Sequence, residues 1–216
     1  MSMCVAKDLR PNFGPARDQD PRPTCMAFAA SDAHAGARPG WEPLSVEWVY
    51  YYALKRDGVE PHQGVHLATM LATLRADGQP VETLWPYIAE LFTDFTAWQP
   101  PRAANPIFRR DSQPAIATVA SIIGHLDRND PVLFTMSISP AFYRPDQDGI
   151  VTSAESLMPK RVHALVAVGH GTRGTDHFIL VRNSWGEAWG LSGHAWIHST
   201  YLEPRLLVAA TMTGER

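Results

Sequence analysis

The pattern of apolar and polar positions divides the chain into a helical first half and a β-rich second half. In the first half apolar residues recur at helical spacing, and polar residues or glycines mark the ends of each run. The pattern predicts a helix that begins after Thr24, its candidate N-cap, and a second from Ser45 to near Gly58. A third is predicted from about residue 65 to residue 75, with Gly78 as its stop.

The second half is dominated by short apolar runs between glycines and polar turns. Proline and aromatic residues interrupt the pattern from 85 to 113, which predicts irregular chain crossing between two lobes. One more helix is predicted over about 115–126, with Pro114 in its first turn. The apolar runs then predict strands at 132–138, 164–168, 178–181, 195–198 and 206–211. Helices followed by strands indicate an α+β protein, with a cleft between its lobes as the place for a site.

Composition and charge exclude several classes of function. The chain of 216 residues is 45% hydrophobic and 19% charged, a balance typical of globular proteins, and its net charge of −3 comes without any basic run. We therefore expect no nucleic-acid partner. The longest apolar run, 164–169, is strand-sized, so no membrane helix is predicted. The first residues lack a signal-peptide pattern, which predicts a cytoplasmic protein as encoded, or one delivered by a signal-independent secretion route.

The two cysteines, Cys4 and Cys25, do not suggest a structural disulfide, because one of them lies near the chain end. His62 and His66 have helical spacing, but no acidic or thiol partner completes a metal motif. We expect no metal and no cofactor.

Three residues together suggest thiol chemistry. Cys25 follows Thr24 at a predicted helix start, where the helix dipole and a nearby imidazolium lower the pKa of a thiol. His163 stands at the entrance of an apolar strand, and Asn183 directly follows another. Taken singly, a free cysteine is often a core residue, and a lone histidine or asparagine is usually structural. Together they supply a nucleophile, a base and a group that orients the base.

The segments around these residues resemble the papain-like cysteine peptidases. The likeness rests on the run from Asp18 to Ala29, on His163-Ala164 before its apolar strand, and on Asn183-Ser184-Trp185-Gly186 followed by Trp189-Gly190. Weaker likenesses extend the resemblance over nearly the whole chain, in the family's order. They lie at Asp8-Leu9-Arg10, Leu84-Trp85-Pro86-Tyr87 and Phe142-Tyr143.

The resemblance implies a single papain-like domain over 1–216. A mainly helical lobe would occupy about 15–110 and a β-barrel-like antiparallel lobe about 111–212, with the N-terminus crossing over and the active-site cleft between. It implies a cysteine-type endopeptidase in which Cys25 is the nucleophile, His163 the base and Asn183 its orienter. Gln19, six positions before Cys25, would help to bind the oxyanion. The implied partner is a peptide or protein substrate, and a regulatory protein is a possible second one.

The resemblance also implies where the substrate binds. The backbone at Gly64 would pair with an extended substrate, and Trp185 would cover the bond between His163 and Asn183. Ala164, with Thr135 or Met136, would line a pocket for an apolar side chain.

Departures from the family pattern qualify this reading. Arg22 replaces a disulfide cysteine, which suits a reducing setting, while Pro23 replaces a glycine and Met26 an aromatic residue. No removable pro-segment is expected, because Asp8-Leu9-Arg10 lies so close to Met1. Two alternatives stay open. One is a papain-like amidase or acyl transferase acting on a specialised protein or a cell-wall peptide, and the other is a catalytically weak peptide-binding module.

Overall fold

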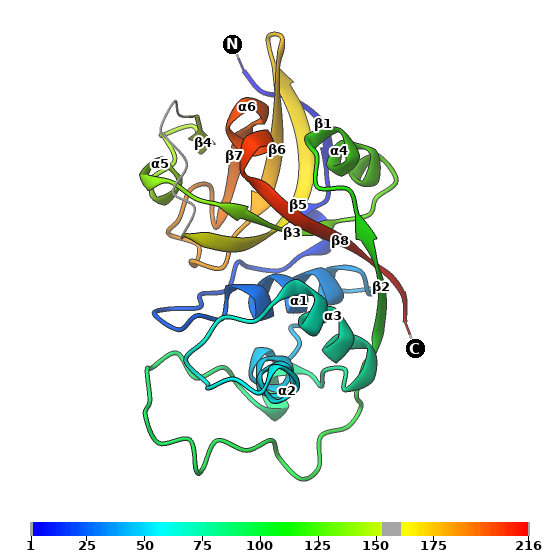
Figure 1. Cartoon of the computed structure of the whole chain (residues 1–216). Helices are drawn as coiled ribbons and strands as arrows, with labels where there is room; N and C mark the ends of the chain where they lie inside the picture. Colours follow the sequence, from blue (N-terminus) through cyan, green and yellow to red (C-terminus); the bar gives the residue numbers. More distant parts are fainter. Residues whose placement is uncertain (1, 153–160, 216) are drawn as a thin grey trace.

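The computed structural model describes residues 2–152 and 161–215, and it has two lobes (Figure 1). The sheet lies in the upper part of the view and helices α1 to α3 lie below it. The α-helices are α1 (Cys25–Gly36), α2 (Val46–Asp57), α3 (Leu67–Ala76), α4 (Val119–Asp127), α5 (Pro140–Tyr143) and α6 (Ser199–Leu202). Short 3-10 turns are Arg10–Asn12, Glu82–Leu84 and Glu203–Arg205.

The strands form one sheet in which neighbouring strands are mostly antiparallel. They are β1 (Cys4–Asp8), β2 (Arg110–Ala115), β3 (Val132–Ser137), β4 (Ile150–Val151), β5 (Val162–Arg173), β6 (Asp176–Arg182), β7 (His194–His198) and β8 (Leu206–Glu215). Their order is β2-β8-β3-β5-β6-β7-β4, and β1 also pairs with β5. Only β4 and β7 run parallel among these pairs in the described residues. β3 and most of β5 are buried, so they form the centre of the core of this lobe.

The helices of the first half follow the sequence pattern. Every residue of α1 after Cys25 is buried, because this helix lies between the sheet and the other helices. α2 begins where predicted: the Ser45 side chain accepts a hydrogen bond from the Trp48 N–H. It ends at Gly58, whose φ of 64° lies in the left-handed region that favours glycine.

The start of one predicted element of the second half is wrong, although the helix itself is present. Residues 110–115 form β2, and the helix begins only at Val119, where the Thr118 side chain accepts from the Ser121 N–H. Pro114 therefore lies in a strand and not in a helical first turn. A proline is tolerated there because β2 is the last strand at its end of the sheet, so its missing N–H need not serve a second neighbour. The five predicted strands are confirmed, several of them longer than expected.

Two features join the lobes. β1 pairs with β5 in the sheet before the chain enters the helical lobe, and β2 pairs with β8 after the chain returns from it. A buried ionic cluster forms the second link: Asp32 of α1 accepts from Arg182 at the end of β6 at 2.7 Å and from Arg17 at 2.6 Å. The boundary between the lobes near residue 110 stays a prediction, although α1 to α3 precede it and β2 to β8 follow it.

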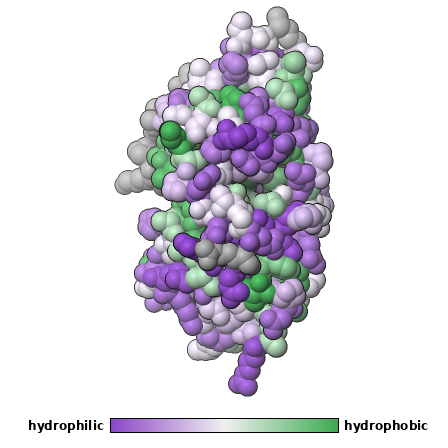
Figure 2. All heavy atoms as spheres, turned by 90° about the vertical axis from the view of Figure 1, so that its right-hand side faces the viewer, coloured by the Kyte–Doolittle hydropathy of each residue, from purple (hydrophilic) through white to green (hydrophobic). Residues whose placement is uncertain are grey.

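The face that Figure 2 shows is mainly hydrophilic, with hydrophobic residues in small, separate patches. Across the described residues, the helices are all too short or too polar to cross a membrane.

Candidate active site

Cys25, the predicted nucleophile, is the first residue of α1, which packs against β5 of the other lobe. The backbone N–H of Ala164 acts on this thiol in the direction that lowers its pKa. Thr24 occupies the N-cap position, but its hydroxyl makes no capping bond and lies 2.8 Å from the Tyr87 hydroxyl instead. The other cysteine, Cys4, is exposed in β1.

Strand pairing brings His163 and Asn183 together. In the antiparallel pair of β5 and β6, Val166 lies opposite Arg182, so the start of β5 lies beside the residues that follow β6. The His163 Nε2 is 2.6 Å from the Asn183 Oδ1. Both side chains are buried.

The hydrogen bonds of Asn183 define the tautomer of His163. The Asn183 Oδ1 also accepts from the Ser184 backbone N–H at 2.8 Å, which identifies this atom as the amide oxygen. A carbonyl oxygen only accepts, so the His163 Nε2 carries the hydrogen. Nδ1 then holds the lone pair that can take a proton from a thiol.

Aromatic rings cover this histidine. The Trp185 ring centroid lies 4.7 Å from that of His163, and Phe142 contacts both rings, at 5.3 Å from Trp185 and 5.8 Å from His163. Excluding water from the bond between His163 and Asn183 strengthens it.

Gln19 is held with its amide in a defined orientation. Its Oε1 accepts from the Ser184 Oγ at 2.7 Å, and its Nε2 donates to the Arg22 carbonyl at 2.8 Å. Its backbone N–H also donates to the Ser184 carbonyl. An amide nitrogen has two hydrogens, so one of them remains for an oxyanion. The sequence reasoning gave Ser184 no role, although its place directly after Asn183 was a usable signal.

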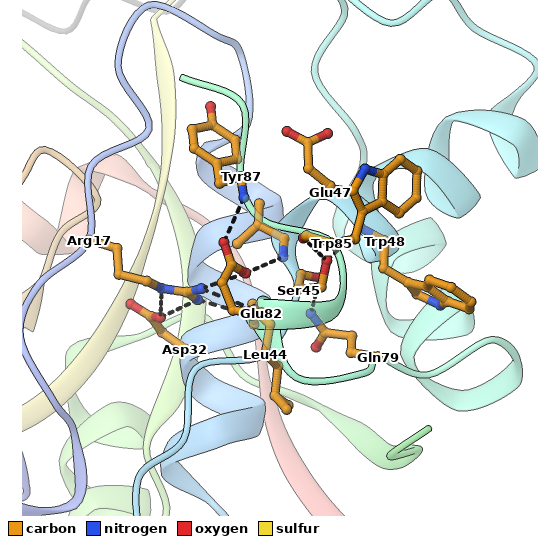
Figure 3. Close-up of polar contacts among 12 residues, drawn as sticks. Arg17, Asp32, Leu44, Ser45, Glu47, Trp48, Gln79, Glu82, Trp85 and Tyr87 are labelled. Carbon is orange, nitrogen blue, oxygen red and sulfur yellow. Dashed lines mark hydrogen bonds and ion pairs between the residues drawn. The ribbon is translucent and has the colours of Figure 1, made fainter. Parts of the chain in front are cut away.

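A hydrogen-bond network supports the segment that carries Gln19 and Cys25, and Figure 3 shows the part of it around Glu82 and Tyr87. The Tyr87 hydroxyl donates to the Gln19 backbone carbonyl at 2.7 Å. The Tyr87 N–H donates to Glu82 at 2.9 Å, and Glu82 also accepts from the Val46 N–H at the start of α2. The network therefore joins the nucleophile segment to α2.

Arg22, at the position of the missing disulfide cysteine, forms a buried ion pair with Glu47 of α2. Glu47 also accepts from the Ile88 N–H at 2.9 Å and from the Trp98 indole N–H at 2.8 Å. The guanidinium of Arg22 lies over the rings of Tyr50, Tyr87 and Phe92. An ionic and aromatic cluster thus ties the nucleophile segment to α2 and to the irregular chain that follows.

Burial shifts the pKa values of the predicted nucleophile and base toward their neutral forms. It raises the pKa of the Cys25 thiol, and the neighbouring backbone N–H groups of Ala164, Met26 and Cys25 offset this only in part. It lowers the pKa of His163 to about 4, against the opposing hydrogen bond to Asn183. The expectation that the helix start lowers the Cys25 pKa is therefore wrong for this structure, because desolvation outweighs the helix-start effect.

A cavity of about 450 Å³ opens beside Cys25 and His163. Both lobes contribute its lining residues, which are Pro23, Cys25, Met26, Gly64, Val65, His66, Leu67, Thr135, Val162, His163, Ala164, Leu207 and Val208. Among the residues that the structure describes, this wall has no acidic side chain.

The cavity contains the predicted substrate-binding residues Gly64, Thr135 and Ala164, while Trp185 lies against His163 outside its lining. A Cβ added at Gly64 would have no neighbour within 4 Å, so this glycine leaves open space beside the cavity. Thr135 is paired with Ala164 across β3 and β5, whereas Met136 is fully buried and does not line the cavity. The sequence reasoning missed three half-exposed apolar lining residues, Val162, Leu207 and Val208, because a strand-like run does not reveal which face borders a cleft.

Residues 101–204 match the sequence model described as papain family cysteine protease. The match includes His163 and Asn183, whereas Gln19 and Cys25 precede it. The chain resembles this family, as its motifs predicted, and the class predicted from sequence, a cysteine-type peptidase and hence a hydrolase, is that of the matched family.

Individual relatives cover different shares of the chain. Zingipain-2 from Zingiber officinale is 38% identical over 66 residues, 31% of this chain and 29% of that protein. The uncharacterized peptidase C1-like protein L477 from Acanthamoeba polyphaga mimivirus is 25% identical over 194 residues, 82% of this chain and 62% of the viral protein. The chain therefore spans less than two thirds of either relative.

Among solved structures, xylellain, a cysteine protease from Xylella fastidiosa, has a TM-score of 0.78 at 19% identity. The similarity covers 97% of this chain and 86% of xylellain. The predicted papain-like α+β fold is confirmed by this similarity.

Proposed function

We propose that this chain is a cysteine-type endopeptidase that hydrolyses peptide bonds through a thioester on Cys25. One observation carries the proposal: His163 donates from Nε2 to Asn183 and so keeps Nδ1 as an acceptor, in a cavity that Cys25 also lines. A peptide-binding protein would not need a thiol and a tautomer-fixed imidazole in the same cavity.

The first half of the reaction forms the thioester. As the Cys25 sulfur bonds to the substrate carbonyl carbon, the thiol proton passes to the His163 Nδ1. The backbone N–H of Cys25, at the first turn of α1, and the free hydrogen of the Gln19 amide donate to the oxyanion. The His163 imidazolium then protonates the leaving amine as the carbon–nitrogen bond breaks.

The second half restores the enzyme. Neutral His163 takes a proton from water, and the water oxygen attacks the thioester carbonyl. The carbon–sulfur bond then breaks, Cys25 regains its proton from His163, and the acid product leaves. Asn183 keeps the imidazole in one tautomer in both halves, and Trp185 shields that hydrogen bond.

The cavity favours an apolar side chain on the acyl side of the cleaved bond. Ala164 is small, and Leu207 and Val208, which line the same cavity, are apolar. A basic side chain would find no carboxylate among the described lining residues.

The test is labelling and cleavage with matched cysteine variants. We expect an epoxide thiol inhibitor to modify Cys25 alone, read by intact mass and peptide mapping, and a peptide library to be cut at internal bonds. Cys25→Ala should lower turnover at least about 10³-fold, whereas Cys4→Ser should keep it.

Other outcomes would favour the alternatives. Labelling of Cys25 without cleavage of any peptide would replace the proposal with an amidase or acyl transferase. Equal activity of Cys25→Ala and the unmodified protein would exclude thiol catalysis and leave a binding module.

A further inference from the structure

A second cavity, of about 530 Å³, lies next to the candidate active site, and we call it the arginine cavity. Its lining residues are Pro140 and Tyr143 of α5, Arg144 directly after that helix, and Arg161 directly before β5. It shares no lining residue with the apolar cavity beside Cys25.

Stacked rings connect the arginine cavity to the catalytic histidine. Tyr143 stacks on Trp185 with ring centroids 5.1 Å apart and planes inclined by 13°, and Trp185 in turn lies 4.7 Å from His163. Arg161 is also only two residues before His163 in the chain. The acyl part of a substrate would occupy the apolar cavity, so the leaving part extends past His163 and Trp185 toward these arginines.

The arginines are arranged to bind an anion. The Arg161 Nη1 donates to the Tyr143 hydroxyl at 2.8 Å, and its guanidinium lies 5.9 Å from the centre of that ring, so one edge of the group is fixed. The described part of the chain supplies no ion-pair partner for Arg161 or Arg144, and the described lining residues of this cavity include no carboxylate. Some other surface arginines do have such partners, as Arg173 has in Asp148. A guanidinium with free N–H groups pairs well with a carboxylate, often through two parallel hydrogen bonds.

We infer that the arginine cavity binds a carboxylate on the leaving part of the substrate, within one or two residues of the cleaved bond. The carboxylate comes from an Asp or Glu side chain or from the substrate's own C-terminus. The inference rests on the proposed peptidase function and adds a substrate class to it, namely peptides that are acidic after the cleavage point.

The test compares quenched fluorescent peptides that share one acyl side and carry Asp, Ala or Lys at the first or second position after the bond. Each peptide is made with a free and with an amidated C-terminus. We expect kcat/KM for Asp to exceed that for Ala by about tenfold, the effect of one charge-assisted contact, and the ratio to fall at high salt. A preference for Asp in amidated peptides identifies the side chain, and a preference confined to short peptides with a free terminus identifies the terminal carboxylate.

The variants Arg161→Gln and Arg144→Gln, alone and combined, should reduce the ratio of Asp to Ala rates toward one. Arg161→Lys should keep part of it, and the matched surface variant Arg173→Gln should keep all of it. Because the readout is a ratio within one protein preparation, a partly unfolded variant cannot imitate the result.

Equal rates for Asp, Ala and Lys in the unmodified protein, or an Asp preference that survives the double variant, would overturn the inference while peptide cleavage itself upheld the proposed function. If no peptide is cut at all, the proposed function fails and the inference fails with it.

Discussion

At the scale of single residues, burial acts on Cys25 and His163 in the same sense, because it favours the uncharged form of each. The thiol pKa is raised and the imidazole pKa is lowered to about 4. At neutral pH the resting site therefore holds a thiol and a neutral imidazole, and the thiolate forms only as the proton moves to His163 during attack.

The pH dependence of kcat/KM should reflect this resting state. Below about pH 4 His163 is protonated and cannot accept the thiol proton, so the acid limb of the profile belongs to His163. The alkaline limb belongs to Cys25 and should lie above the ordinary thiol pKa. The profile should be measured over pH values at which far-UV circular dichroism shows a folded protein.

Ultraviolet absorbance of the thiolate near 240 nm supplies the direct check, with Cys25→Ala as the blank. The difference between the two proteins should be absent at pH 7. A thiolate signal that persists down to pH 5 would show instead that a resting ion pair forms.

The sequence revealed the candidate catalytic residues, but it revealed less about the atoms that orient them. Cys25, His163 and Asn183 each sit in a short contiguous motif, which can be recognised without a structure. The bond between Ser184 and Gln19 joins residues 165 positions apart, so only the folded chain reveals it. The net effect of burial on the Cys25 pKa was unpredictable for the same reason, since desolvation depends on the whole surroundings.

At the scale of elements, β1 shows why some strands leave no hydrophobic pattern. Cys4, Val5 and Ala6 are exposed, and backbone pairing with β5 holds the strand in place. Gly169 in β5 makes this approach possible, because a Cβ there would meet the Lys7 carbonyl oxygen at 2.5 Å. The pairing therefore depends on a residue that has no side chain, and a pattern of apolar positions does not reveal such a requirement.

The cluster around Arg22 and Glu47 should stabilise the nucleophile segment without any redox dependence. Glu47→Gln leaves a buried guanidinium without its counter-ion and should lower the free energy of unfolding by about 3–5 kcal/mol. Urea unfolding followed by tryptophan fluorescence measures this, and a reductant should leave the midpoint unchanged.

The exposed pair between Arg56 and Asp77 provides the matched control. Arg56→Met should cost less than about 1 kcal/mol, because water screens this pair. A Glu47→Gln variant as stable as Arg56→Met would show that the buried pair contributes nothing to stability.

At the scale of the whole molecule, buried histidines make stability depend on pH. Burial lowers the pKa of His34 to about 3 and those of His163 and His194 to about 4. The unfolded chain binds protons at these groups near the ordinary value of 6.5, so between about pH 6.5 and 4 it binds more protons than the folded chain. Stability is therefore complete above pH 6.5 and is lost as the pH falls through this range.

Asp32 behaves in the opposite way. Burial alone would raise its pKa, but Arg17 and Arg182 outweigh this and hold the pKa below the ordinary value of 3.8. The stability that this cluster contributes is present above that pH and is lost only under stronger acid. As the pH falls, the stability that depends on the buried histidines should therefore be lost before the stability that the Asp32 cluster contributes.

Urea midpoints at pH 7, 5.5 and 4.5 should fall in that order. Each pKa unit corresponds to about 1.4 kcal/mol, so the three histidines together can remove several kcal/mol of the roughly 5–15 kcal/mol typical of a folded protein. His34→Gln should reduce the change of the urea midpoint with pH, and the exposed control His62→Gln should leave this change as it is. Equal midpoints at pH 7 and 4.5 would contradict the burial argument.

The pairing of β1 with β5 also determines how the chain can be divided. A cut in the largely exposed irregular segment 89–97 would leave one fragment with β1, Gln19 and Cys25, and another with β2 to β8, His163 and Asn183. The first fragment would hold half of the chemistry and a single strand, and the second would hold the other half and a sheet that lacks β1. Thiol activity would then report that the two pieces had met.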